Sequence, residues 1–185
     1  MRRRATRTIL AVDHSRSNLT LLANRLGNLG YLIVLADSGS QALELISARG
    51  FDLVLLDKAM PEISGVQMLH EIRGARDTAD LPVVVLTCDS DPRASLEAFA
   101  AGADDFVTRP FEFDVLAARI NRVLMRADRI EELKRSNLAL DARIAARAIE
   151  LGEARAELAV GQADRKRLTA SIQSLHDELD RLQRV

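Results

Sequence analysis

The stretch DLVLLDKAMPEISG, at positions 52–65, decides the fold of this chain. Residues 53–56 form an apolar run with the length and composition of a strand that is buried on both faces. Asp57 closes the run, and a loop separates it from a helical pattern that begins near Ser64. The stretch therefore predicts a strand–loop–helix unit with an acidic side chain at the end of a buried strand.

Four similar units surround this one in the sequence. Continuous apolar strands that alternate with helical patterns are typical of a parallel sheet covered by helices on both faces. We therefore expect an α/β fold built on a doubly wound, five-stranded parallel sheet. The predicted strands are 8–12, 31–36, 51–56, 81–86 and 105–108, and the predicted helices are 17–29, 38–48, 64–73, 92–101 and one that begins near Glu112.

Polar side chains follow four of the five predicted strands. Asp13 and His14 come after the first, Asp57 ends the third, Thr87 the fourth, and Arg109 follows the fifth. In sheets of this kind ligands bind at the carboxyl ends of the strands. One aspartate at a strand end is equally well explained as a helix cap, but the five residues together favour a binding or catalytic site.

Composition separates the chain into two parts and excludes several classes of protein. The 185 residues include 26 basic and 27 acidic ones, so no charge excess points to nucleic acid. All six aromatic residues lie between Tyr31 and Phe113, and the last proline is Pro110, which argues against one uniform globule. The single Cys88, expected at the edge of the core, excludes an internal disulfide. No run of 18 apolar residues suggests a membrane span, and we expect a cytoplasmic protein.

The tail carries a different pattern, an apolar 4-3 repeat that predicts a coiled coil over 127–185. The residues of the seam favour a parallel homodimer. One core position of the repeat holds leucine or branched residues, the other holds leucine, and one core position is an asparagine. Arg147, Gly161 and Arg165 weaken the middle of the seam, and a three-residue step from Ile130 to Leu133 makes a stammer. Two interpretations stay open, a flexible spacer and a seam whose register shifts. The predicted seam residues are Leu133, Asn137, Leu140, Ile144, Leu151, Leu158, Leu168, Ile172, Leu175, Leu179 and Leu182.

Residues 7–126 resemble the receiver domain of two-component response regulators, the CheY-like family. The strings that carry the resemblance are ILAVDHS (9–15), DLVLLDKAMPEISG (52–65), VVVLTC (83–88) and GADDFVTRPF (102–111). The resemblance implies a flavodoxin-like receiver fold with strand order 2-1-3-4-5. With it we divide the chain into a flexible basic N-terminus (1–6), a receiver (7–126) and a coiled-coil helix (127–185). We expect Arg7, at the start of the receiver, to be solvated like Arg2–Arg4.

The resemblance also implies roles for individual residues. Asp57 would be the phosphoacceptor, with Mg²⁺ held by Asp13, Asp57 and the backbone carbonyl of Ala59. Thr87 would hydrogen-bond the phosphoryl group, and its movement would draw in an aromatic residue on the fifth strand. That aromatic is Phe106, and the Arg109–Pro110 peptide matches a position that is cis in this family.

Two residues depart from the family pattern. His14 stands where the family places the second acid, the direct metal ligand, and imidazole suits zinc, copper or nickel better than Mg²⁺. Arg109 stands where the family places lysine, and its planar fork is not equivalent to an ammonium group at a phosphate site.

We therefore expect a response regulator that a histidine kinase or phosphotransfer protein phosphorylates on Asp57. It would pass the signal through its last receiver helix to a dimeric coiled coil, with no catalysis beyond its own phosphorylation and dephosphorylation. We expect neither DNA binding nor a membrane partner, because the eleven bases of 127–185 balance eleven acids. Two alternatives stay open. The chain is the front of a longer protein with cyclic-di-GMP or histidine kinase output, or an atypical receiver that acts mainly as a dimerisation module.

Overall fold

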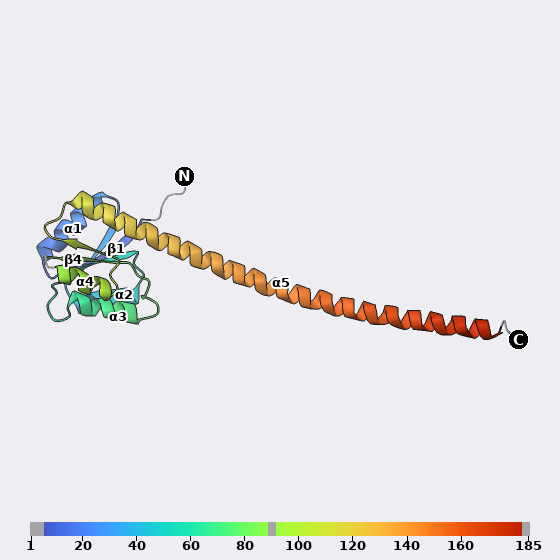
Figure 1. Cartoon of the computed structure of the whole chain (residues 1–185). Coiled ribbons are helices and arrows are strands. Elements are labelled where there is room, and N and C mark those ends of the chain that lie inside the picture. The colour runs from blue at the N-terminus through green and yellow to red at the C-terminus, as the bar shows by residue number, and fades with distance from the viewer. Residues whose placement is uncertain (1–5, 89–91, 183–185) are drawn as a thin grey trace. The chain divides into compact units, whose positions relative to one another are not determined.

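The computed structural model describes residues 6–88 and 92–182, without the side chains of 92–95 and 175–182. Helices and strands alternate along the chain (Figure 1). Their bounds are β1 (Thr8–Val12), α1 (Arg16–Asn28), β2 (Leu32–Ala36), α2 (Gly39–Ala48), β3 (Leu53–Asp57), α3 (Gly65–Gly74), β4 (Val83–Thr87), α4 (Pro92–Ala100), β5 (Asp105–Thr108) and α5 (Phe113–Leu182).

The five strands form one sheet in the order β2-β1-β3-β4-β5, and every neighbouring pair is parallel. The register pairs Val12 with Leu56, Asp57 with Leu86, and Thr87 with Thr108. The predicted doubly wound sheet and its strand order are confirmed. Because all strands run the same way, their carboxyl ends meet at one edge of the sheet.

Alternate residues of each central strand enter two different cores. From β1, Leu10 and Val12 pack with side chains of α2 and α3, whereas Ile9 and Ala11 pack with side chains of α1 and the first turns of α5. Figure 1 shows these helices on opposite sides of the sheet. Burial on both faces is why the strands are apolar throughout rather than alternating with polar residues.

Serine side chains set the starts of three helices. Ser15, Ser38 and Ser64 precede α1, α2 and α3, and the hydroxyl of each accepts a hydrogen bond from a backbone N–H in the first turn. At α3, Gln67 completes a reciprocal capping box with Ser64. Ser38 and Ser64, predicted as first helical residues, are therefore caps, a role that contributes about 1 kcal/mol to a helix.

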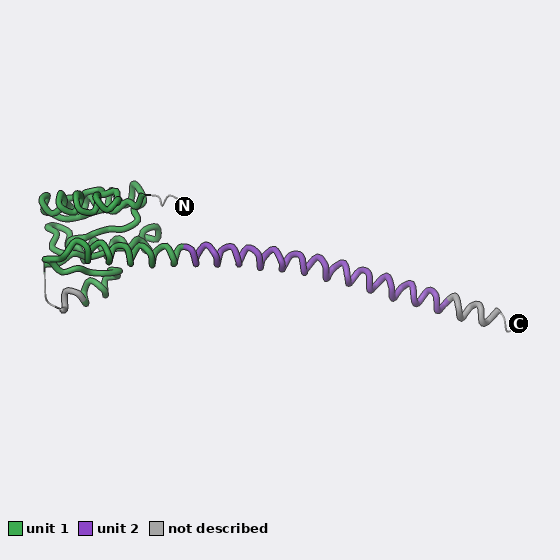
Figure 2. The backbone as a smooth tube through the Cα atoms, turned by 90° about the horizontal axis from the view of Figure 1, so that it is seen from above, with its two compact units in different colours: residues 1–131 green, residues 132–185 purple. Residues whose placement is uncertain are grey.

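The chain divides into two compact units, Met1–Glu131 and Glu132–Val185 (Figure 2). The described part of the second unit consists of the α5 residues that follow Glu131. From the sequence alone, the boundary between the receiver and the coiled-coil helix is predicted near residue 126. Within residues 6–88 and 92–182, no helix carries a stretch apolar enough to cross a bilayer.

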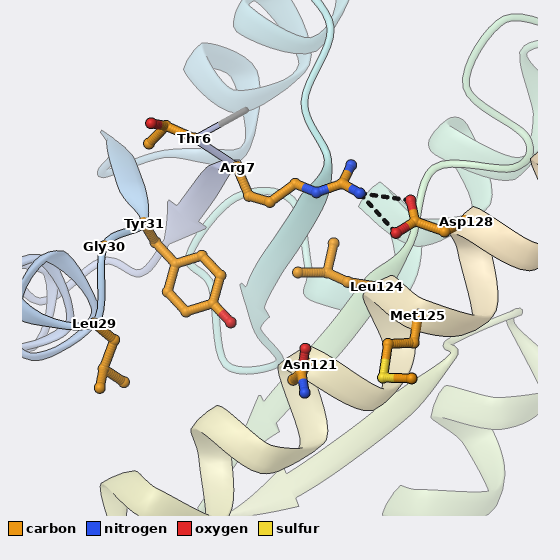
Figure 3. Close-up of a pocket in the computed structure, with 9 residues that line it drawn as sticks. All are labelled: Thr6, Arg7, Leu29, Gly30, Tyr31, Asn121, Leu124, Met125 and Asp128. Carbon is orange, nitrogen blue, oxygen red and sulfur yellow. Dashed lines mark hydrogen bonds and ion pairs between the residues drawn. The ribbon is translucent and has the colours of Figure 1, made fainter. Parts of the chain in front are cut away.

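Arg7 corrects the expectation that it shares the solvated character of the basic terminus. Its guanidinium donates to Asp52 at 2.5 Å and to both carboxylate oxygens of Asp128 at 2.6 and 2.7 Å. It therefore ties the start of β1 to α5 within the first unit. The Arg7–Asp128 pair borders a pocket of about 260 Å³ at the amino ends of the strands, toward which Tyr31 points (Figure 3).

Candidate functional site

The polar residues predicted at the strand ends do lie at one edge of the sheet. Asp13 and His14 follow β1, Asp57 ends β3, Thr87 ends β4, and Arg109 follows β5. Asp13, Asp57 and Thr87 are 0%, 1% and 4% exposed, and they are the buried polar or charged residues of the described chain. Burying two carboxylates costs several kcal/mol each unless a partner compensates, so a cationic partner is expected beside them.

Arg109 is the partner of both buried carboxylates. Its Nη2 donates to Asp13 Oδ2 at 2.6 Å, and its Nη1 donates to Asp57 Oδ1 at 3.1 Å. The backbone N–H of Arg109 also donates to the carbonyl of Thr87 at 2.7 Å, and the Arg109–Pro110 peptide is cis, as expected. A planar guanidinium thus bridges two strand ends, which a compact ammonium could not do with the same geometry.

Asp57 keeps one oxygen without a partner. Its Oδ2 is fully buried and accepts no hydrogen bond from the described residues, while His14 Nδ1 lies 3.4 Å from it. Burial raises the pKa of Asp57, and the charge of Arg109 opposes that rise. A buried oxygen with free lone pairs is a position where an electrophile or a cation would be stabilised.

Asp13 is held in place by residues of the first helix. Its Oδ1 accepts from the backbone N–H of Ser15 at 2.8 Å, and the side-chain amide of Asn18 donates to Oδ2 at 3.0 Å. The sequence did not single out Asn18 as part of the site. Its position five residues after Asp13, on the first turn of α1, is the signal that could have identified it.

The threonine and the aromatic predicted to switch together lie on adjacent strands. Thr87 pairs with Thr108 in the register of β4 and β5, and Phe106 pairs with Val85. The Phe106 ring packs edge-on against Phe99 of α4, with 5.3 Å between centroids. The structure records this one state, so the coupled movement of Thr87 and Phe106 stays a prediction.

The loop after β3 passes close beneath the start of α3. The backbone N–H of Lys58 donates to Leu86, and that of Gly65 donates to the carbonyl of Lys58. Ala59 is exposed in this loop, and the metal-binding role of its carbonyl stays a prediction. Cys88, expected at the core edge, is exposed instead.

One ligand atom from each of Asp13, His14 and Asp57 lies within 4.8 Å of the other two. His14 is 49% exposed and so connects the buried carboxylates to solvent. Two carboxylates and a carbonyl are ligands that Mg²⁺ accepts, and the unpartnered Asp57 oxygen is suited to a cation. The residues present therefore fit a divalent cation.

In the second unit, the predicted seam residues lie on one continuous helix. Asn137 is exposed, and the apolar seam residues with described side chains are between 49% and 67% exposed in the single chain. Those apolar residues are Leu133, Leu140, Ile144, Leu151, Leu158, Leu168 and Ile172, whereas Leu175, Leu179 and Leu182 lie outside the described side chains.

Two relatives match more than half of this chain. A transcriptional regulatory protein ZraR of Escherichia coli is 40% identical over 116 residues, which are 63% of this chain and 26% of that protein. A probable cyclic di-GMP phosphodiesterase of Vibrio cholerae is 35% identical over 144 residues, 78% of this chain and 32% of that protein. The chain thus spans about a quarter to a third of the length of these two relatives.

Solved structures and a family model agree on what the first unit is. A crystal structure of a putative response regulator from Chloroflexus aurantiacus superposes with a TM-score of 0.64 at 31% identity, covering 65% of this chain and 99% of that one. The model of the response regulator receiver domain matches residues 9–121, more than half of the chain. This match, with the sheet order and the strand-end carboxylates, shows that the chain belongs to the response regulator receiver family.

Proposed function

We propose that Asp57 receives a phosphoryl group from a sensor histidine kinase or a phosphotransfer protein. The observation that carries the proposal is Asp57 Oδ2, a buried carboxylate oxygen without a hydrogen-bond partner among the described residues. It faces the half-exposed His14 side chain, so a phosphoryl donor can approach from that side. Receiver domains work with such kinases, and a cytoplasmic location is part of the proposal because those kinases draw on ATP.

The residues around Asp57 suit the transfer chemically. An oxygen of the Asp57 carboxylate attacks phosphorus, the bond from phosphorus to the donor imidazole breaks, and that imidazole keeps the electron pair and takes up a proton. Arg109 already contacts the other Asp57 oxygen, so its charge is in place when the phosphoryl group arrives. Thr87, buried at the end of the adjacent strand, would offer its hydroxyl to a phosphoryl oxygen.

The proposal includes a Mg²⁺ ion, which Asp13, Asp57 and the Ala59 carbonyl would hold. When bound, it would screen the negative charge on the phosphoryl oxygens. The chain's own contribution is the fixed position of Asp13, set by Ser15 and Asn18, and the charge of Arg109.

Incubation with acetyl phosphate and Mg²⁺ should add one phosphoryl group to the wild-type chain, measured by intact mass. Asp57→Asn should abolish the addition, because it removes the nucleophilic oxygen. Asp37→Asn is the matched control, since Asp37 also follows a strand end but its side chain is exposed and β1 separates its strand from β3. Labelling of Asp57→Asn, or none in the wild type, would contradict the proposal and favour an atypical receiver that acts as a dimerisation module.

The output we propose is a parallel homodimeric coiled coil formed by the second unit. The exposed apolar side chains of residues 133–172 support it, because at about 1.5 Å per residue they form a seam roughly 60 Å long that only another long helix could cover. A second copy of this chain supplies such a helix in register, with Asn137 facing its counterpart.

The dimer has a matched pair of variants. Ile144→Lys with Leu151→Lys should convert a particle of twice 20.4 kDa into one of 20.4 kDa in light scattering, because two charges enter the seam. Leu138→Lys with Ile149→Lys should leave the mass unchanged, since these residues are 70% and 64% exposed but lie off the 4-3 repeat. Equal masses for both double variants would exclude the predicted seam.

A second candidate places the receiver and helix in front of a cyclic-di-GMP enzyme. The match to the Vibrio cholerae phosphodiesterase spans 144 residues, more than the 131 of the first unit, so it includes part of the second unit. In this alternative the helix would pass the receiver's state to that catalytic output. The reading frame after the codon for Val185 separates the two proposals, because only the second requires a catalytic domain there.

A further inference from the structure

The triad of Asp13, His14 and Asp57 has the spacing of ligands around a small metal ion. His14 Nδ1 lies 3.4 Å from Asp57 Oδ2 and 3.8 Å from Asp13 Oδ1. Ligands at about 2.0–2.1 Å from a tetrahedral metal stand about 3.3–3.4 Å apart. The distances from the imidazole nitrogen to the two carboxylates are therefore close to those between ligands that share one ion.

The contact between His14 and Asp57 is long for a hydrogen bond. Asp57 Oδ2 is buried and accepts none from the described residues, although the imidazole nitrogen is 3.4 Å away. A buried carboxylate oxygen that accepts no well-aligned hydrogen bond has lone pairs available for a cation, and the neighbouring imidazole nitrogen can bind the same ion.

Arg109 contacts the oxygen of each carboxylate that is not the one near His14. It contacts Asp13 Oδ2 and Asp57 Oδ1, so Asp57 Oδ2 and Asp13 Oδ1 are the oxygens nearest His14. Asp13 Oδ1 also accepts a hydrogen bond from the backbone N–H of Ser15, which holds it in place. The guanidinium and a metal ion can therefore bind the same pair of carboxylates at once. The arginine also reduces the charge of the pair from −2 to −1, which weakens the attraction for any divalent ion held by charge alone.

A charge-poor site with an imidazole ligand favours a particular class of metal. Mg²⁺ binds through oxygen ligands in near-ideal octahedral geometry, and it depends on carboxylate charge. Borderline ions such as Co²⁺, Ni²⁺ and Zn²⁺ bind imidazole strongly and accept mixed nitrogen and oxygen ligands. We propose that His14 is a metal ligand and that the pocket binds these borderline divalent ions in preference to Mg²⁺. The inference deepens the proposed function, because it concerns the cation of the same pocket.

The test measures binding of the metal alone, with no phosphoryl donor present. Calorimetric titration of the full chain should give a dissociation constant for Co²⁺ at least about tenfold lower than that for Mg²⁺. His14→Ala should weaken Co²⁺ binding at least about tenfold. His14→Asp should invert the preference, since it restores an oxygen ligand and a negative charge. The visible absorption of bound Co²⁺ should change in the His14 variants as the nitrogen ligand is lost.

His70→Ala is the matched control, because His70 is exposed on α3 and lies outside the triad. It should leave Co²⁺ affinity and the absorption spectrum unchanged. The proposal is overturned if Mg²⁺ binds the wild type as tightly as Co²⁺, or if His14→Ala binds Co²⁺ like the wild type. These outcomes are independent of phosphorylation, since a chain that binds Co²⁺ through His14 but takes no phosphoryl group contradicts the proposed function alone.

Discussion

Arg109→Met should lower the free energy of unfolding of the first unit by about 3–5 kcal/mol at neutral pH. The substitution keeps an unbranched apolar side chain but removes the guanidinium, and it leaves two carboxylates, 0% and 1% exposed, without their cation. An uncompensated buried charge is far more costly than a lost surface pair. Urea unfolding followed by fluorescence of Tyr31, the single tyrosine, measures the first unit without a signal from the second.

Arg119→Met is the matched control for this result. Arg119 contacts Asp105 at 2.8 Å, but its side chain is 45% exposed, so the pair is screened by solvent. We expect a loss of at most about 1 kcal/mol. Similar losses in the free energy of unfolding of the two variants would show that burial of the carboxylates does not explain the effect of Arg109→Met.

The pH dependence of stability in the Arg109→Met variant identifies which buried carboxylate causes the loss. Burial raises the folded-state pKa of Asp57 above 3.8, and Arg109 opposes that rise. A raised carboxyl pKa means that the folded state binds the proton more tightly than the unfolded state does. The free energy of unfolding therefore falls as the pH rises from 3.8 through the pKa of Asp57 in the folded state. Removing Arg109 raises the pKa further, and the difference from wild type should grow with pH. Adding Asp57→Asn should reduce both the loss and its pH dependence; an unchanged loss would assign the effect to Asp13.

The fold could be predicted because its determinants are local. Each central strand is apolar throughout, as burial on both faces requires, and each of the first three helices is preceded by a serine that caps it. The convergence of Asp13, Asp57 and Thr87 follows from parallel strands alone. The order of the strands came from the family resemblance, because periodicity does not tell which strands are neighbours.

The details of the site depend on side-chain directions that no spacing encodes. Asn18 supports Asp13 only because α1 begins in a particular orientation, and Arg109 bridges two carboxylates only because its fork reaches both. Arg7 has two acidic partners that are 45 and 121 residues away in the sequence. For the tail, the sequence predicts the helix correctly, but a single chain leaves its apolar residues exposed and does not identify their partner.

Gly65→Ala should be the second strongly damaging change, with a loss of about 3 kcal/mol in the free energy of unfolding. A Cβ at position 65 would lie 2.6 Å from the carbonyl oxygen of Asp57 and 2.9 Å from Cα of Lys58. Both are backbone atoms, fixed by the pairing of Asp57 with Leu86 and by the hydrogen bond from Lys58 to Leu86. The methyl group can be accommodated only if α3 or the end of β3 shifts.

Because that shift would move the proposed phosphoacceptor itself, Gly65→Ala should also slow labelling by acetyl phosphate by about 100-fold. Gly27→Ala is the matched control, since Gly27 lies in α1 and a Cβ there meets no atom within 4 Å. It should stabilise the first unit by about 0.5–1 kcal/mol, because alanine favours the helix over glycine. Urea unfolding and the labelling rate, measured on both variants, decide the point. If Gly65→Ala unfolds and labels like the wild type, the close approach of α3 to Asp57 does not set the geometry of the site.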